Sequence, residues 1–285
     1  HMKKTEKEPR PYRGLVDEIK EQHQKMKDMT FKEKWKYFWY YYKFHVIAII
    51  AVLVFGGNLV HDMVTAKDYI FNGIMLNSSY LDQEPMEKAF AEYAELDTEN
   101  YDCFIDTLST LSYSGSTDYD YSTFYKLVAQ VQTKDLDVLV MDSQICYNFA
   151  TNGMMSDLRT VLTEEELSAY EGNIYYIDYA EVKALEAADD TDPAVQAQYD
   201  ERNNANAEEA AQEAELHRDP SSMKEPVPIG IFIADSPLVT KTYAYSELVP
   251  IFTFPATSQR EKKEKKYLEF VWDETVPFEN LVTVY

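Results

Sequence analysis

The sequence predicts an α/β domain with a parallel or mixed sheet and flanking helices, preceded by one transmembrane helix. Three observations predict it: an uncharged apolar run over 46–60, opposite charge balances on its two sides, and strand-like segments that alternate with helix-like ones behind it. The chain has 285 residues, enough for one large domain or two small ones with a buried core.

The apolar run VIAIIAVLVFGGNLV, from Val46 to Val60, contains no charged residue. It is short for a bilayer, which needs about 20 residues, but the preceding YFWYYYKFH adds rings that settle at the membrane interface. A signal peptide fits poorly, because a long basic stretch precedes the run and no cleavage site follows promptly. A soluble core helix would rarely be apolar all round. We therefore predict a permanent transmembrane helix over 38–60.

Charge predicts the orientation of this helix. Residues 1–45 contain 12 Lys and Arg against 7 Asp and Glu, whereas the remainder contains 15 against 43. Because Lys and Arg gather on the cytoplasmic side, the basic tail over 1–37 is predicted inside and the acidic domain over 68–285 outside. The tail is attracted to anionic lipid or, alternatively, binds a cytoplasmic partner. The acidic domain repels nucleic acid, so no such partner is expected.

Strands are expected where apolar residues run or alternate between turn signals. These segments are Asp68–Leu76, Tyr101–Ser109, Leu136–Asp142 and Pro226–Ser236. The third, LDVLVMD, is a continuous apolar run that ends in a carboxylate, which is typical of a buried parallel strand. The side chains of Val138 and Val140 are expected on one face of this strand. Those of Leu139 and Met141 are expected on the other.

Helices are expected between these strands, because apolar residues there recur with helical spacing behind capping residues. They span Glu84–Leu96, Asp120–Thr133, Ser143–Gly153, Thr163–Glu171 and the segment 258–274. Thr163 and Glu166 have the spacing of a capping box, and Gly153 is an expected helix stop. The Ala- and Glu-rich segment over 181–226 has few large apolar residues and is predicted to be an exposed, acidic helical insertion.

One stretch resembles a known family. In KDLDVLVMDSQICYNFATNGMMSDLRTVL, residues 134–162, the chain is similar to extracellular solute-binding proteins of the periplasmic-binding-protein-like class, type 2. The positions that fit that family's pattern are Asp137, Val138, Leu139, Val140, Asp142, Phe149, Gly153, Met155, Asp157 and Leu158. The segments IGIFIADS and KKYLEFV resemble the strand and closing helix of the family's second lobe. The lead-in MTFKEKWKYFWYYYKFHVIAII resembles that of uncharacterised single-pass membrane proteins of Gram-positive clostridial bacteria.

This resemblance implies a non-enzymatic domain, anchored in the cell membrane by a single pass, that binds a polar small molecule or a cell-wall fragment. The chain departs from the family in lacking the lipidated Cys of its leader, and about 215 residues follow the predicted helix, fewer than two full lobes need. The alternative is therefore a structural or interaction subunit that contacts another envelope protein without a cleft.

A ligand site is expected beyond the carboxyl ends of the strands, where open α/β sheets bind ligands. The candidate ligand-binding residues there are Asn77, Ser78, Ser79, Ser109, Tyr113, Asp142, Ser143, Asp235 and Ser236. Their hydroxyl, amide and carboxyl groups suit hydrogen bonds to a polar solute or an anion. The competing interpretation is that they are ordinary helix caps and turn residues.

No catalytic motif is present in the sequence: HExxH, GxSxG, the P-loop and GxGxxG are all missing. We therefore expect no catalytic residue, no metal ligands and no cofactor, with an envelope hydrolase using paired carboxylates as the enzymatic alternative. Cys103 and Cys146 are expected as free buried thiols or as a disulfide. The 23 Tyr residues are either half-buried packing residues or part of a recognition surface.

Overall fold

The computed structural model describes part of the chain. The described residues are 30, 67–112, 117–188, 193, 197, 200, 201 and 204–282. The chain divides into two compact units, His1–Ala66 and Lys67–Tyr285, and all described residues but one belong to the second. The helix predicted over 38–60 lies outside the described residues. Within the described ranges, no helix is both long and apolar enough to cross a bilayer.

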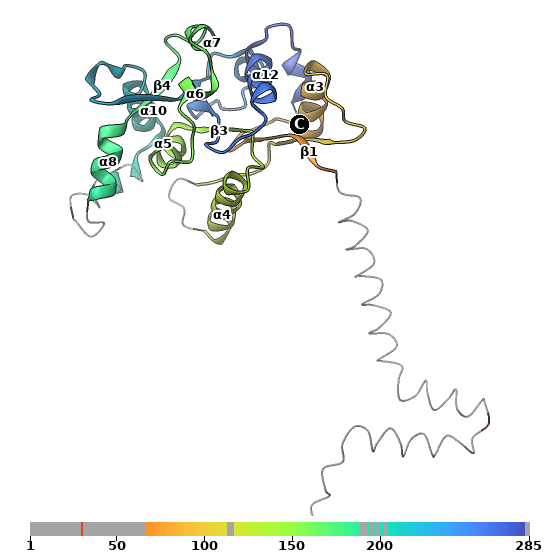
Figure 1. Ribbon diagram of the computed structural model, residues 1–285, viewed down its shortest axis with the longest axis horizontal. Coiled ribbons are helices and arrows are strands. Elements are labelled where there is room, and N and C mark those ends of the chain that lie inside the picture. The colour runs from red at the N-terminus through yellow and green to blue at the C-terminus, as the bar shows by residue number, and fades with distance from the viewer. Residues whose placement is uncertain are drawn as a thin grey trace, which may run out of the picture. The chain divides into compact units, whose positions relative to one another are not determined.

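The second unit is built on a six-stranded mixed sheet of order β2-β1-β3-β6-β5-β4 (Figure 1). Its strands are β1 Tyr69–Met75, β2 Asp102–Asp106, β3 Val138–Asp142, β4 Ile174–Asp178, β5 Pro226–Phe232 and β6 Pro250–Thr253. β1 pairs in parallel with β2 and β3, whereas β6 is antiparallel to both β3 and β5, and β4 is antiparallel to β5. The carboxyl ends of β1, β2, β3 and β5 therefore lie at the same edge of the sheet.

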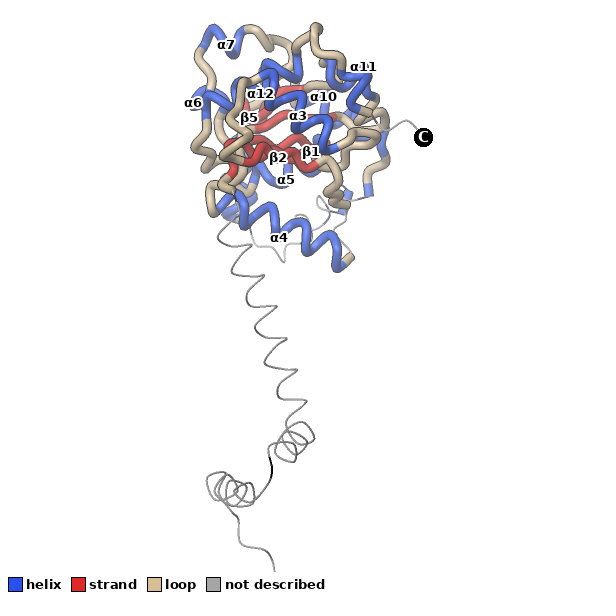
Figure 2. The backbone as a smooth tube through the Cα atoms, turned by 90° about the vertical axis from the view of Figure 1, so that its right-hand side faces the viewer, coloured by secondary structure: helices blue, strands red, loops and turns tan. Residues whose placement is uncertain are grey.

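Helices cover both faces of this sheet. They are α3 Gln83–Tyr93, α4 Asp118–Gln132, α5 Ser143–Thr151, α6 Leu158–Val161, α7 Glu164–Ser168, α8 Tyr179–Ala187, α10 Ala207–Leu216, α11 Pro237–Thr242 and α12 Glu261–Trp272, with short 3-10 helices at Pro220–Ser222 and Phe278–Leu281. Figure 2 shows α3 and α12 on one side of the sheet and α4 and α5 on the other. The architecture is thus an α/β sandwich of three layers.

A hydrophobic layer lies on each face of the sheet. Val138 and Val140 of β3 belong to the layer under α3 and α12, and Leu139 and Met141 belong to the layer under α4 and α5. All four side chains are fully buried. The alternation predicted for this strand is therefore confirmed, and β3 contributes to both layers at once.

The predicted strands and helices are present, with ends that differ by a few residues. Two strands were not predicted. β6 has only four residues and begins with a proline, and β4 is a short aromatic run, so neither has a strong local signal. Because β6 is antiparallel and lies between β3 and β5, the sheet is mixed rather than parallel.

Two predicted helix boundaries are confirmed in atomic detail. At the start of α7, the Glu166 backbone N–H donates to Thr163 Oγ1 at 3.1 Å, and the Thr163 N–H donates to Glu166 Oε2 at 2.7 Å, which is the predicted capping box. Gly153 follows α5 with a φ of 69°, a conformation that glycine adopts without strain.

The starts of two other helices are fixed by side-chain caps. Helix α4, expected from Asp120, begins at Asp118, because Thr117 accepts a hydrogen bond from the Asp120 N–H at 3.1 Å and forms a capping box there. Helix α5 begins at Ser143, as expected, behind Asp142, whose carboxylate accepts from the N–H of Ile145.

Two expectations about the second half of the chain need correction. Strand β5, which the resemblance assigns to a second lobe, lies in the same sheet as β1 and β3. The described residues therefore form one lobe. In the predicted insertion, Val182 of α8 and Ala214 of α10 are buried in the layer under α5, so the part of that segment seen in the structure is not wholly exposed.

Both cysteines are free thiols. Cys103 is half-buried in β2 and Cys146 is buried in α5. Burial raises the pKa of both, to about 12 for Cys103, so each thiol stays protonated and unreactive at neutral pH. Of the two alternatives for these residues, the structure has the free, largely buried thiols.

Candidate functional site

Eight of the nine predicted ligand-binding residues follow or end strands at the carboxyl edge of the sheet. The residues placed there, at the ends of β1, β2, β3 and β5, are Asn77, Ser78, Ser79, Ser109, Asp142, Ser143, Asp235 and Ser236. Tyr113 lies outside the described residues. The topology therefore gathers the predicted set along one edge, and the question is whether their polar groups are free to bind a ligand.

Asn77 and Asp142 meet between β1 and β3, whose following helices, α3 and α5, cover opposite faces of the sheet. Asn77 Nδ2 donates to Asp142 Oδ2 at 3.1 Å and to the Leu111 carbonyl at 2.9 Å. In return, the Leu111 N–H donates to Asn77 Oδ1 at 2.8 Å, while Asp142 Oδ1 accepts from the Ile145 N–H at 3.2 Å. Burial raises the pKa of Asp142. Open α/β sheets bind ligands at such a point. Here, however, both side chains already form hydrogen bonds within the protein.

The serine hydroxyls are used in the same way. Ser109 Oγ donates to Asp106 Oδ2 at 2.6 Å, and Ser78 Oγ donates to the Thr107 carbonyl at 3.0 Å. Ser236, fully buried, accepts from the N–H of Val239 and caps α11. The hydrogen bonds therefore favour the interpretation of these residues as caps and turns. Among the predicted set, Ser79 and Asp235 have exposed side chains.

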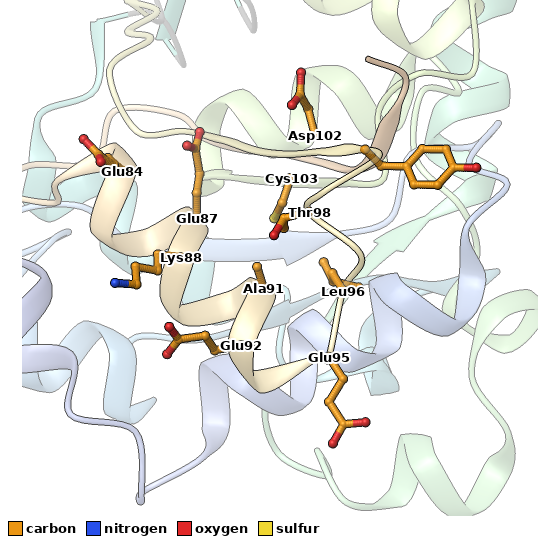
Figure 3. A pocket seen from close by; sticks show the side chains of 11 residues that line it. Glu84, Glu87, Lys88, Ala91, Glu92, Glu95, Leu96, Thr98, Asp102 and Cys103 are labelled. Atoms are coloured by element: carbon orange, nitrogen blue, oxygen red, sulfur yellow. The ribbon is translucent and has the colours of Figure 1, made fainter.

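A pocket of about 490 Å³ opens elsewhere, between α3, the turn that follows it and the start of β2 (Figure 3). Its acidic lining residues are Glu84, Glu87, Glu92, Glu95 and Asp102. Lys88 is the basic residue of the lining, and Ala91, Leu96 and Cys103 contribute apolar contacts. The pocket thus combines an acidic rim with an apolar floor.

Glu87 has a structural role in this pocket. Its Oε1 accepts from the backbone N–H of Ile105 at 3.1 Å and from Gln83 Nε2 at 2.9 Å. Because β2 is an edge strand, this contact occupies one of the backbone donors that the edge would otherwise present to another chain. Glu87 also contributes, after burial, to the raised pKa of the Cys103 thiol.

The other four carboxylates of the pocket, on Glu84, Glu92, Glu95 and Asp102, are exposed. None of them forms an ion pair with a described residue of the chain. These four carboxylates around the pocket outnumber its one basic lining residue, Lys88, and together produce a negative potential that attracts cations. The pocket is therefore suited to a positively charged ligand.

Sequence reasoning missed this pocket, although one signal was present. Glu84, Glu87 and Glu92 recur with helical spacing on the side of α3 away from the buried Met86, and Glu95 follows in the turn after the helix. A charged helix face is usually only its solvated side. No local pattern shows that the turn after α3 returns beside that face and closes a pocket against it.

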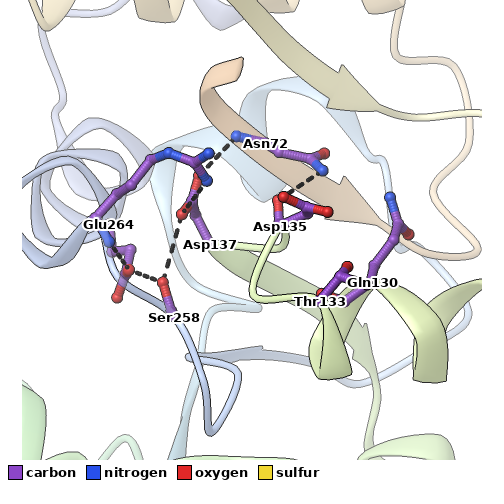
Figure 4. Close-up of polar contacts among 8 residues, drawn as sticks. Asn72, Gln130, Thr133, Asp135, Asp137, Ser258 and Glu264 are labelled. Carbon is purple, nitrogen blue, oxygen red and sulfur yellow. Dashed lines mark hydrogen bonds and ion pairs between the residues drawn. The ribbon is translucent and has the colours of Figure 1, made fainter. Parts of the chain in front are cut away.

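The chain matches no protein-family model, no curated protein and no solved structure. The resemblance to solute-binding proteins is therefore supported only by the matching residues of this sequence. Some of those residues have structural roles in the fold. Asp137 is fully buried and accepts from Arg260 at 3.0 Å (Figure 4), and Asp157 caps α6 through the N–H of Arg159. The geometry of the pocket is the stronger basis for a functional argument.

Proposed function

We propose that the chain is a membrane-anchored ligand-binding protein without enzymatic activity, whose acidic domain lies outside the cell membrane. The observation that supports binding is the acidic pocket between α3 and β2. Its volume of about 490 Å³ falls in the range of about 300–1,000 Å³ typical of small-molecule sites. The anchor and its orientation are supported by the uncharged run over 46–60 and its basic flank.

The ligand class follows from the charge and the floor of the pocket. Four exposed carboxylates favour a cation, while Ala91 and Leu96 offer apolar contact to a hydrocarbon chain. An organic amine has both features, because its ammonium group pairs with carboxylates and its methylene groups pack on apolar side chains. We therefore propose an amine-bearing polar solute or envelope fragment as the ligand. A likeness to solute-binding proteins in residues 134–162 supports the same class of function.

Thermal unfolding of the full-length chain in detergent tests this proposal, with spermidine as the probe. A ligand at 100 times its Kd stabilises the folded state by about 2.7 kcal/mol, which raises Tm by about 5–10 °C for a domain of this size. The double variant Glu92→Gln, Glu95→Gln should lose most of this shift. The matched control is Glu164→Gln, Glu165→Gln, which removes the same charge from α7 and should retain the shift.

Two results would contradict the proposal. One is the absence of any shift with spermidine in the unmodified chain. The other is an equal loss of the shift in the α7 control, which would mean that the amine responds to the net charge of the domain and not to the pocket.

A structural or interaction subunit is the second candidate, and helix α4 favours it. This helix packs on the sheet through Leu127 and Val131. Tyr121 and Tyr125 lie one turn apart on its outer side and are 56% and 66% exposed. An exposed aromatic face of this kind is typical of protein contact surfaces. A photoreactive residue in place of Tyr125 should then form crosslinks to another envelope protein in cells, whereas one in place of Glu165 should not.

A further inference from the structure

Two exposed tyrosines at the carboxyl edge of the sheet have a backbone conformation that bulky residues rarely adopt. Tyr80 has a φ of 64° and Tyr243 a φ of 57°, both in the left-handed region that favours glycine. Their side chains are 55% and 68% exposed. The rings are therefore not needed to fill the core, and glycine would fit either backbone position with less strain.

The two tyrosines stand on adjacent loops. The Ser79 N–H donates to the Ala244 carbonyl at 2.8 Å, which ties the loop after β1 to the loop after α11. Tyr80 directly follows Ser79, and Tyr243 directly precedes Ala244. Ala244 is 1% exposed, so the shared backbone of the two loops is held firmly by the core while both rings face solvent.

A third exposed apolar side chain lies on the neighbouring loop. Leu108, two residues after the end of β2, is 70% exposed. Its loop is bonded to the Tyr80 loop, because Ser78 Oγ donates to the Thr107 carbonyl at 3.0 Å. Ser79 and Ser246, exposed residues of the two tyrosine-bearing loops, provide hydroxyl groups. The loops at the carboxyl edge thus present aromatic, apolar and hydroxyl groups to solvent.

We propose that Tyr80, Tyr243 and Leu108 form a binding surface for a neutral saccharide, separate from the acidic pocket. The face of a tyrosine ring packs against the C–H groups of a sugar ring, and its hydroxyl bonds to sugar hydroxyls. The surface lies where β2 ends, whereas the pocket lies where β2 begins.

Other occupants fit this surface less well. The chain after residue 45 has 43 acidic against 15 basic residues, so it repels anionic glycans and anionic lipid surfaces. A peptide that binds by adding a β-strand needs an open strand edge for its backbone, and this surface consists of loops. A neutral saccharide needs neither positive charge nor a free strand edge.

Calorimetric titration of the full-length chain in detergent tests the proposal, with chitotetraose and cellotetraose as probes. We expect at least one of them to bind, and Tyr80→Ala or Tyr243→Ala to weaken that binding about tenfold or more. The sharper variant is Tyr243→Gly. Glycine adopts a φ of 57° without strain, so this variant should raise Tm by about 1–4 °C while it weakens saccharide binding as much as Tyr243→Ala does.

The matched control is Lys134→Gly. Lys134 is exposed and has a φ of 64°, but it lies in the turn after α4, away from this edge. It should gain stability similarly and leave saccharide binding unchanged. Failure of both oligosaccharides to bind would overturn the proposal, as would unchanged affinity or a lower Tm in Tyr243→Gly. A spermidine shift that persists in Tyr243→Gly would show that this surface is independent of the pocket, and its loss would contradict that independence.

Discussion

Glu264, in the first turns of α12, is a buried carboxyl group, 2% exposed, within a polar cluster (Figure 4). Its Oε1 accepts from the Arg260 N–H at 3.1 Å and from the Ser258 hydroxyl. The Arg260 guanidinium forms an ion pair with the neighbouring Asp137 carboxylate. Burial, and then the charge of Asp137, raise the pKa of Glu264 to about 8. The group is therefore mostly neutral at pH 7.

This shift predicts how stability depends on pH. The ordinary pKa of a Glu is 4.5, so between pH 4.5 and about 8 the folded state holds a proton that the unfolded state has lost. The stabilisation is fully present below pH 4.5 and is lost as pH rises through about 8. Asp137, whose pKa is also raised by burial, acts in the same direction. Glu264→Gln should therefore be more stable than the unmodified chain by about 1–3 kcal/mol at pH 9 and similar to it at pH 5.

Urea unfolding of both proteins at the two pH values measures this difference. Gln is neutral at any pH and keeps the oxygen that accepts from Arg260, which makes it a conservative probe of the charge. The prediction is wrong if the two proteins lose stability in parallel as pH rises.

At the scale of elements, strand β3 holds the two hydrophobic layers together. Every residue of β3 is buried, and it pairs with β1 on one side and β6 on the other. Val138→Asp and Leu139→Asp should each lower Tm by more than 10 °C, and by similar amounts, because each places an unpaired charge in one of the two layers. Thermal melts followed by circular dichroism measure both variants, with Val138→Ile as the apolar control. A sharp difference between the two Asp variants would mean that one face of β3 is open to water.

The C-terminal part of the Ala- and Glu-rich segment packs against β4. Ala214 of α10 is buried, the His217 ring stacks on Tyr175 at 4.6 Å between centroids, and the Tyr176 N–H donates to the His217 carbonyl at 2.8 Å. Replacing residues 189–205 with a short Gly/Ser linker should leave a cooperative melt. Extending the replacement through His217 should cost about 3 kcal/mol or more, since it removes this packing. Equal stability of the two replacements would show that α10 contributes nothing to the domain.

The elements that sequence patterns predicted are those with strong local signals. The apolar run of β3, the capping box at Thr163 and the glycine stop after α5 all depend on residues close together in the chain. The placement of β6 depends on pairing between Leu139 and Thr253, which are far apart in sequence, so no local pattern reveals it. The same limit explains why β5 was assigned to a second lobe.

The chemistry of the residue types also limits how well the candidate site can be predicted from the sequence. Asn, Ser and Asp at strand ends are as suitable for capping a helix as for binding a ligand, and Asn77, Ser109 and Asp142 are engaged in the fold. The sequence alone does not distinguish the two uses. The strain at Tyr80 and Tyr243 is a property of the backbone and has no counterpart in the residue pattern.

At the scale of the whole molecule, both proposed binding sites require the acidic domain to lie outside the cell membrane. The basis for this is the charge difference across the uncharged run over 46–60, with an excess of Lys and Arg before it and a large excess of Asp and Glu after it. An amine or a neutral saccharide of the envelope reaches the proposed sites only with this orientation.

Proteolysis of intact cells tests the orientation most directly. The cells would produce the full-length chain with an epitope tag at each end and the recognition sequence of a site-specific protease within residues 189–205. Protease added outside should separate the C-terminal tag from the membrane and leave the N-terminal tag on a membrane-bound fragment, with the basic tail protected until the cells are opened. A chain that stays intact in whole cells and is cleaved only after lysis would place the acidic domain inside and contradict the account.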